Sequence, residues 1–197
     1  MSRFEIASFP TLTTKRLILR EVVDADADDL LVFRGDPEVQ RYNLDPMKTR
    51  SEALSLIRTM QGWFASRYAI QWGITLRGED RVLGLCGLHD WSRNHRRASL
   101  GYDLARSHWG RGIATESMNA VLRYGFEQMN LNRIEAVTIV DNTRSIRLLE
   151  RLGFALEGVR RESSLENDGK FHGSAVYGLL RSEYRPELAP PESLTAE

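Results

Sequence analysis

Two glycines lie within residues 108–117, which read HWGRGIATES and lead into an amphipathic stretch. Glycine destabilises a helix, so a pair of them at a helix start needs a reason. The first amides of a helix have no partner within it, and the helix dipole places partial positive charge there. Small residues would let these amides approach an anion such as a pyrophosphate. From these residues alone, an ordinary tight turn is an equally good interpretation.

Two other phosphate-binding loops do not fit this segment. A P-loop needs four residues between its glycines and then Gly-Lys followed by Ser or Thr, and the chain has no such run. A dinucleotide-binding fingerprint needs glycine or alanine at position 115, which is threonine, and a βαβ unit near the start of the chain. Neither class of nucleotide site is therefore expected.

The elements that must position this segment differ between the two halves of the chain. The first half predicts a strand at 16–22, helices at 24–35 and 49–67, and an antiparallel meander of strands at 68–76, 81–91 and 97–105. The second half predicts a helix from about 113 to 129, a strand at 133–140, a helix at 141–153 and two more strands. This order predicts an α+β domain around one mixed sheet, in which the strands before and after the 113–129 helix lie parallel.

Length and composition limit the class of protein. The 197 residues, 42% of them hydrophobic, suit one domain, which we expect over residues 1–184. Residues 185–197 hold three of the six prolines and predict a mobile tail. The 27 basic and 27 acidic side chains balance, which argues against a nucleic-acid partner. A single cysteine, Cys86, excludes an internal disulfide, and no stretch is apolar enough for a membrane span, so we expect a cytoplasmic protein.

Several motifs together resemble one enzyme family. The segment WGRGIA (109–114) followed by TES, the segment NTRS (142–145) and the segment ERLGF (150–154) resemble the GNAT superfamily of acetyl-CoA-dependent N-acetyltransferases. The tryptophan and the RLILR strand resemble the branch that acetylates N-terminal alanines of ribosomal proteins. Trp109 stands where the family pattern has Gln or Arg. The resemblance implies a GNAT fold, with a mixed, mostly antiparallel sheet, helices on both faces, and fourth and fifth strands that splay apart.

The resemblance also implies how acetyl-CoA, the co-substrate, would be held. The backbone amides of residues 111–115 would bind the pyrophosphate, and residues 102–104 would pair with the pantetheine arm as an added strand. Asn142, which is also a plain helix cap, would contact that arm. The positions that the resemblance assigns to acetyl-CoA are Tyr102, Asp103, Leu104, Trp109, Gly110, Arg111, Gly112, Ile113, Ala114, Thr115, Asn142, Ser145 and Arg147, with Arg144 available for the phosphates.

The acid and the base are harder to assign. Many relatives carry a tyrosine that protonates the departing thiolate, but Leu149 occupies that place here. Ser145 matches a serine that serves at the sulfur in the ribosomal-protein branch, and a first-turn capping role is an equal alternative. The base candidates are Asp103, Glu135 and Glu162, each of which has a surface or structural role as its alternative.

The missing base bears on the acceptor. An α-amine has a pKa of about 7.7–8.0 and is partly neutral near neutral pH, whereas a lysine amine, with a pKa of about 10.4, is almost fully protonated. We therefore expect acetyl transfer to a protein N-terminus. The alternatives are a small amine (a polyamine, an amino acid or an aminoglycoside) and a non-catalytic acyl-CoA-binding domain. Both a monomer and a homodimer remain open, and no metal site is expected from the spacing of the histidines.

Overall fold

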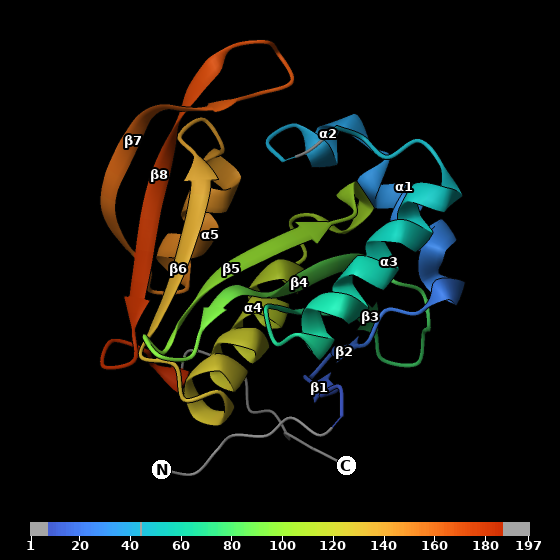
Figure 1. Cartoon of the computed structure of the whole chain (residues 1–197), viewed down its shortest axis with the longest axis horizontal. Helices are drawn as coiled ribbons and strands as arrows, with labels where there is room; N and C mark the ends of the chain where they lie inside the picture. Colours follow the sequence, from blue (N-terminus) through green and yellow to red (C-terminus); the bar gives the residue numbers. More distant parts are fainter. Residues whose placement is uncertain (1–7, 44, 187–197) are drawn as a thin grey trace.

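A single eight-stranded sheet runs through the computed structural model, which describes residues 8–43 and 45–186 (Figure 1). Its strand order is β1-β2-β3-β4-β5-β6-β8-β7. Neighbours are antiparallel except β5 and β6, which are parallel because the chain crosses over through a helix between them. The strands are Leu12–Thr13 (β1), Leu17–Arg20 (β2), Ile70–Leu76 (β3), Gly84–Ser92 (β4), Arg97–Leu104 (β5), Arg133–Ile139 (β6), Ala155–Leu165 (β7) and Phe171–Leu180 (β8). The predicted α+β class with a mixed, mostly antiparallel sheet is confirmed.

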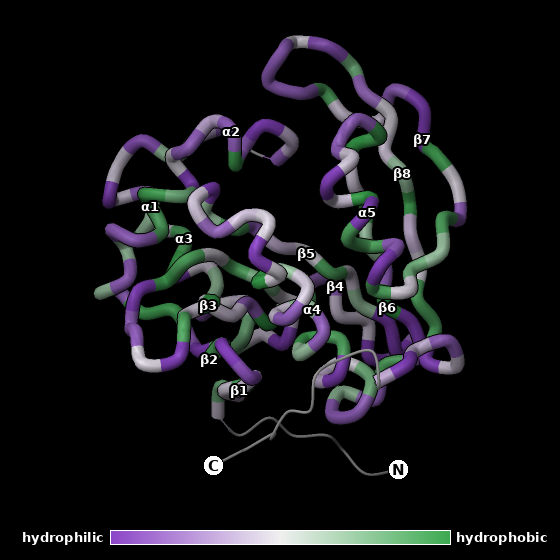
Figure 2. Tube along the Cα trace, turned by 180° about the vertical axis from the view of Figure 1, so that it is seen from behind, coloured by the Kyte–Doolittle hydropathy of each residue, from purple (hydrophilic) through white to green (hydrophobic). Residues whose placement is uncertain are grey.

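Helices cover both faces of the sheet, as predicted. On one face, α1 and α3 pack against a cluster that includes Val22, Val82 and Leu85. On the other face, α4 and α5 pack into a larger cluster with Leu88 and Leu179. Figure 2 views the molecule from the opposite side to Figure 1, with this face toward the viewer. The helices are Ala27–Arg34 (α1), Pro37–Gln40 (α2), Arg50–Ala65 (α3), Ile113–Arg123 (α4) and Thr143–Arg151 (α5), with short 3-10 turns at Asp24–Asp26 and Arg106–His108.

Two predicted helices differ in detail from those observed. The helix expected over 24–35 is a 3-10 turn followed by α1, and a separate short helix, α2, begins at Pro37 after Asp36 caps it through the amide of Glu38. The helix expected over 113–129 ends as an α-helix at Arg123 and continues as a π-helical segment, Tyr124–Gln128. Sequence periodicity does not distinguish these forms, because all of them bury a similar apolar face.

The structure describes the two ends of the chain only from residue 8 and up to residue 186. Residues 1–7, 44 and 187–197 are outside the described residues, so most of the tail predicted at 185–197 is not tested, and the single-domain boundary stays a prediction. Over residues 8–43 and 45–186, no helix combines the length and the apolar character that crossing a bilayer requires.

Candidate functional site

The parallel pairing between β5 and β6 is short. Residues 97–99 pair with 133–135, and beyond Ser99 each strand pairs only with its outer neighbour, β5 with β4 and β6 with β8. These are the fourth and fifth strands predicted from the sequence, so their divergence is confirmed. From residue 100 to 104 the edge of β5 on the side of β6 is not paired with another strand. An extended ligand can hydrogen-bond to such an edge as an added strand does.

The glycine segment forms the start of α4. Gly110 and Gly112 have φ angles of +73° and +76°, a left-handed conformation that glycine adopts without strain. The amide of Glu116 donates to the carbonyl of Gly112 over 3.0 Å, so the amides of residues 113–115 precede the first hydrogen bond that enters the helix. Residues 110–112 are exposed while Ile113 is buried, so the segment is anchored with its backbone at the surface. This geometry fits a pyrophosphate group.

A buried carboxylate ties this segment to the N-terminal strands. Glu116, 6% exposed in the first turn of α4, accepts hydrogen bonds from the Thr14 hydroxyl at 2.6 Å and from Arg16 Nε at 2.6 Å. Arg16 in turn donates to the carbonyl of Arg111 at 2.9 Å. Burial acts to raise the pKa of Glu116, but the hydrogen bonds from Thr14 and Arg16 outweigh it and lower the pKa overall. Sequence reasoning missed this contact, although the glutamate of TES in a first helical turn was a signal.

Trp109 joins the same segment to β5 and α5. Its indole Nε1 donates to the carbonyl of Leu104, the last residue of β5, over 2.7 Å. The Arg144 guanidinium lies 4.5 Å from the centre of the indole ring, a cation–π contact. The tryptophan that departs from the family pattern therefore links the strand end, the glycine segment and the first turn of α5. It also places Arg144 beside the segment that fits a phosphate.

The first turn of α5 meets β5 across the divergence. Asn142 caps α5 by accepting from the amide of Ser145 at 3.2 Å, and Ser145 is 7% exposed. Burial raises the pKa of the Tyr102 phenol on β5, and the Ser145 side chain opposes this shift only in part. Leu149, by contrast, is 2% exposed and belongs to the apolar core.

Asp103, predicted both as a cofactor contact and as a base, lies in a buried polar network. Its carboxylate is 2.5 Å from the Arg34 guanidinium and accepts from Asn43 Nδ2 at 2.7 Å. Burial raises the pKa of Asp103, and the charge of Arg34 opposes this. The structure thus connects Asp103 with α1 and with the loop after α2, and its carboxylate is engaged by a cation.

The other two predicted bases lie elsewhere. Glu135 on β6 is bonded to Arg133 Nε at 2.8 Å and lies 3.7 Å from Arg97. It sits at the paired start of β5 and β6, before the strands diverge. Glu162 is exposed on β7, with a φ of +46° at an irregular stretch of the pairing with β8. The structure therefore does not bring the three carboxylates together.

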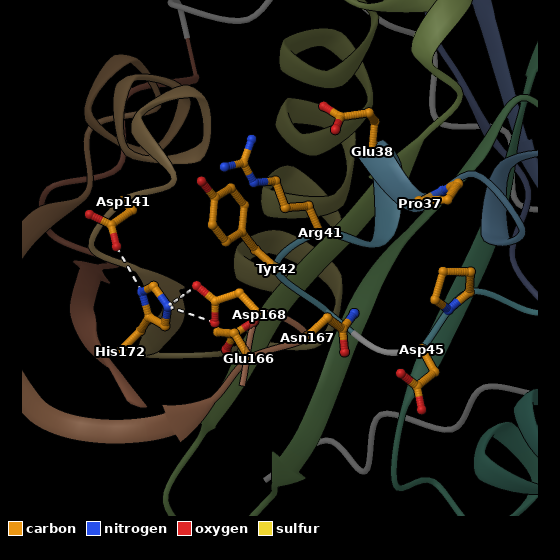
Figure 3. A pocket seen from close by; sticks show the side chains of 11 residues that line it. Pro37, Glu38, Arg41, Tyr42, Asp45, Asp141, Glu166, Asn167, Asp168 and His172 are labelled. Atoms are coloured by element: carbon orange, nitrogen blue, oxygen red, sulfur yellow. Dashed lines mark hydrogen bonds and ion pairs between the residues drawn. The ribbon is translucent and has the colours of Figure 1, made fainter. Parts of the chain in front are cut away.

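A cavity of about 460 Å³ opens between α2 with its following loop, the β7–β8 connection and the end of β6 (Figure 3). Five carboxylates line it, together with one arginine and one histidine. Both walls, α2 and the tip of the β7–β8 hairpin, are predominantly hydrophilic (Figure 2). The lining residues are Pro37, Glu38, Arg41, Tyr42, Asp45, Pro46, Asp141, Glu166, Asn167, Asp168 and His172. The excess of negative charge suits a cationic ligand.

His172 fastens the hairpin wall of this cavity. Its ring nitrogens lie 2.8 Å from Asp141, next to the α5 cap, and 3.0 Å from Asp168 in the β7–β8 connection. Hydrogen bonds to Asp141 and Asp168 raise the pKa of His172. Sequence reasoning did not find this cavity. Its residues come from two parts of the chain, 37–46 and 141–172, and no local motif marks them.

Comparisons with known proteins agree with this geometry. The family model described as an acetyltransferase (GNAT) domain matches residues 16–155. An uncharacterized N-acetyltransferase of Bacillus subtilis, YoaA, is 38% identical over 88% of this chain and 98% of its own length. The [ribosomal protein uS5]-alanine N-acetyltransferase of Escherichia coli is 27% identical over 89% of this chain and 93% of its own. Among solved structures, the spermidine N-acetyltransferase of Vibrio cholerae, in complex with CoA and spermine, shares the fold with a TM-score of 0.77 and 23% identity, over 87% of this chain and 99% of that one.

Proposed function

This chain belongs to the GNAT acetyltransferase family and is an acetyl-CoA-dependent N-acetyltransferase, and from that premise we propose that its acceptor is the α-amine of a protein N-terminus. The family assignment favours catalysis over the alternative of a non-catalytic acyl-CoA-binding domain.

In our proposal the glycine segment and β5 hold acetyl-CoA. The amides of residues 111–115 bind the pyrophosphate, with Arg144 and Arg147 near the remaining phosphates. The pantetheine arm pairs with the inner edge of β5 at residues 102–104. Two observations support this placement: the amides of residues 113–115 precede the first hydrogen bond of α4, and β5 has no pairing with β6 beyond Ser99.

The chemistry follows from this placement. The neutral amine attacks the thioester carbonyl carbon, and the backbone amide near Leu104 stabilises the charge on the carbonyl oxygen. The thiolate leaves toward Ser145, whose hydroxyl lies beside the divergence of β5 and β6. Acetyl-CoA supplies the activated acyl group, and the residues of this chain orient it.

The observation that carries the α-amine proposal is the state of the candidate bases. Asp103 is held by Arg34 and Glu135 by Arg133, while Glu162 is exposed on the outer strand of the sheet. An incoming amine would have to displace an arginine to reach either of the first two carboxylates. An acceptor amine with a pKa of about 7.7–8.0 is partly neutral without a base, whereas a lysine side chain is not.

A second candidate acceptor, a cationic small amine, is favoured by the cavity. Its five carboxylates against one arginine and one histidine would attract a polyamine, and the fold neighbour from Vibrio cholerae is named for spermidine. The same charge would also attract a protonated N-terminus, so charge alone does not separate the two candidates. The curated relative that acts on the uS5 alanine supports the first candidate.

A panel of amines tests the proposal through thiol release from acetyl-CoA. It contains a peptide that begins with a free alanine, the same peptide with a blocked N-terminus and an internal lysine, and spermidine. We expect kcat/KM for the free-alanine peptide to exceed that for the other two by at least about tenfold, because only its amine is substantially neutral at pH 7.5. A higher kcat/KM for spermidine would replace the first candidate with the second.

A further inference from the structure

The guanidinium of Arg16 bonds to the backbone of the glycine segment. Its Nη1 donates to the carbonyl of Arg111 over 2.9 Å, and its Nη2 lies 3.3 Å from the position that a Cβ on Gly112 would occupy. Arg16 belongs to the connection between β1 and β2, 95 positions before the carbonyl that it contacts. The segment proposed to bind the pyrophosphate is therefore held by a side chain from outside its own motif.

Arg16 is itself held at both ends. Its backbone amide donates to Glu116 Oε1 at 2.8 Å, and its backbone carbonyl accepts from the amide of Arg77 at 2.8 Å. Its Nε donates to Glu116 Oε2 at 2.6 Å. Glu116 is 6% exposed, and a bond between two charged groups is stronger than one between neutral groups. The guanidinium thus has a fixed place beside the glycine segment.

The bond to the carbonyl of Arg111 also determines where the next amide points. The carbonyl of Arg111 and the amide of Gly112 belong to one peptide group, and no peptide bond among the described residues is cis. In a planar trans peptide the C=O and N–H bonds point in opposite directions. Because the carbonyl points to Arg16, the amide of Gly112 points away from it. Within residues 8–43 and 45–186 this amide has no hydrogen-bond partner.

Glycine alone does not fix this direction. Gly110 and Gly112 permit the positive φ angles of the segment, but a residue without a Cβ also leaves the neighbouring peptide groups free to rotate. Ordering such a group on binding costs affinity, and a contact that orients it beforehand avoids that cost. The bond from Arg16 is such a contact.

We propose that Arg16 is a positioning residue for acetyl-CoA, whose bond to the carbonyl of Arg111 directs the amide of Gly112 toward the pyrophosphate. Glu116 acts through Arg16 by holding its Nε. Arg16 in turn offsets the negative charge of Glu116, which lies in the first turn of α4 and would otherwise repel a phosphate. This inference rests on the proposed placement of the pyrophosphate at residues 111–115 and not on the identity of the acceptor amine.

Three acetyl donors separate this role from a general loss of stability. Acetyl-CoA and acetyl-dephospho-CoA carry the pyrophosphate, whereas S-acetylpantetheine does not. In Arg16→Gln we expect kcat/KM to fall about 20-fold with each of the first two donors, the size of one hydrogen bond to a charged group, and at most about threefold with S-acetylpantetheine. No fall, an equal fall with all three donors, or a fall with acetyl-CoA only would overturn the proposal.

Arg20→Gln is the matched control. Arg20 ends β2, and its guanidinium also holds a buried carboxylate, that of Asp26, at 2.8 Å. Both variants lose an arginine and an ion pair, so both should lower the free energy of unfolding in a denaturant titration. Only Arg16→Gln should lower the ratio of kcat/KM for acetyl-CoA to kcat/KM for S-acetylpantetheine. The same decrease in Arg20→Gln would mean that lost stability is sufficient, and it would overturn the proposal.

Arg16→Lys separates geometry from charge and replaces Arg16→Gln if that variant does not fold. Lysine keeps the positive charge beside Glu116 but lacks the planar guanidinium that bonds to Glu116 and to the carbonyl of Arg111 together. We expect the donor ratio of Arg16→Lys to fall at least about fivefold. A wild-type ratio would show that charge is sufficient and would refute the positioning role.

The same ratio distinguishes this inference from the proposals on which it rests or borders. If Gly112→Val lowers the donor ratio and Arg16→Gln does not, the placement of the pyrophosphate stands and this inference alone fails. If neither variant lowers the ratio, both fail. Failure of the α-amine proposal would appear instead as a changed order of amines in the panel, with the donor ratios of all variants as expected.

Discussion

The two halves of the site are built on different principles. The half proposed for acetyl-CoA is made of consecutive residues at the junction of β5 and α4, held by backbone geometry and by one buried carboxylate, Glu116. The half proposed for the amine is a cavity between two connecting segments, lined by side chains from distant parts of the chain. Backbone contacts are nearly independent of side-chain identity, whereas the cavity depends on each side chain that lines it. The first half can therefore serve one fixed ligand and the second can change its acceptor.

The largest effect is expected from Gly112→Val. Valine is strained in a backbone conformation with a φ of +76°. Its side chain would also lie close to Arg16, since an added Cβ would be 3.3 Å from Arg16 Nη2. Loss of two or more backbone bonds to phosphate should weaken CoA binding at least about 100-fold. Gly78→Val is the control, because Gly78 has a φ of +84° and open space around it. Calorimetry should show wild-type affinity for the control, and equal losses in both variants would contradict the backbone argument.

The next effect concerns the carboxylate beneath the glycine segment. Glu116→Gln should weaken CoA binding about tenfold and lower the free energy of unfolding by about 1–2 kcal/mol, because the ion pair with Arg16 is lost and the bond from Thr14 no longer has a charged acceptor. The pKa of Glu116 is lower in the folded protein, so its contribution is present above the unfolded pKa and is lost as the pH falls through the folded value. Denaturant titrations at pH 7 and pH 4 should show that acidification lowers the free energy of unfolding less in Glu116→Gln than in the wild type. An equal decrease in both proteins would exclude this role.

On the acceptor side the expected effect is smaller, because the charges are exposed. The double variant Glu38→Gln/Asp45→Asn removes two of the five carboxylates that line the cavity. KM for the amine should rise about fivefold and KM for acetyl-CoA should stay the same. The control is Asp24→Asn/Asp28→Asn, which removes the same charge from the region of α1. An equal rise in the control would mean that net charge, rather than the cavity, attracts the amine.

The smallest effect is the protonation of His172. Its bonds to Asp141 and Asp168 raise its pKa. The stability that these ionic contacts contribute is therefore fully present below the ordinary histidine pKa and is lost as the pH rises through the pKa of the folded protein. Proton NMR should show a pKa for His172 above the ordinary histidine value, and Asp141→Asn should lower it. A His172 pKa that Asp141→Asn leaves unchanged would contradict the contact.

What could be predicted from the sequence follows the same division. The glycine segment, the cap at Asn142 and the parallel crossover depend on residues close in sequence, so local patterns and the family resemblance indicated them. Glu116 and Thr14 are a hundred residues apart, and only the folded sheet brings them together. The cavity was missed for the same reason. The π-helical segment after α4 was missed as well, because the close approach of Gly125 to Leu88 and Ile134, where a Cβ would lie only 3.1 and 3.0 Å away, is also a contact between distant residues.

The early end of the β5–β6 pairing has one more consequence. Beyond Ser99, β5 presents a strand edge inside the sheet rather than at its margin. Exposed edges invite pairing with a second chain and hence aggregation. Here the Trp109 indole donates to the carbonyl of Leu104 at the end of that edge, and the Arg144 guanidinium from the first turn of α5 lies 4.5 Å from the centre of the indole ring. The side chains that lie at the proposed binding site thus also hinder the pairing of this edge with strands of other chains.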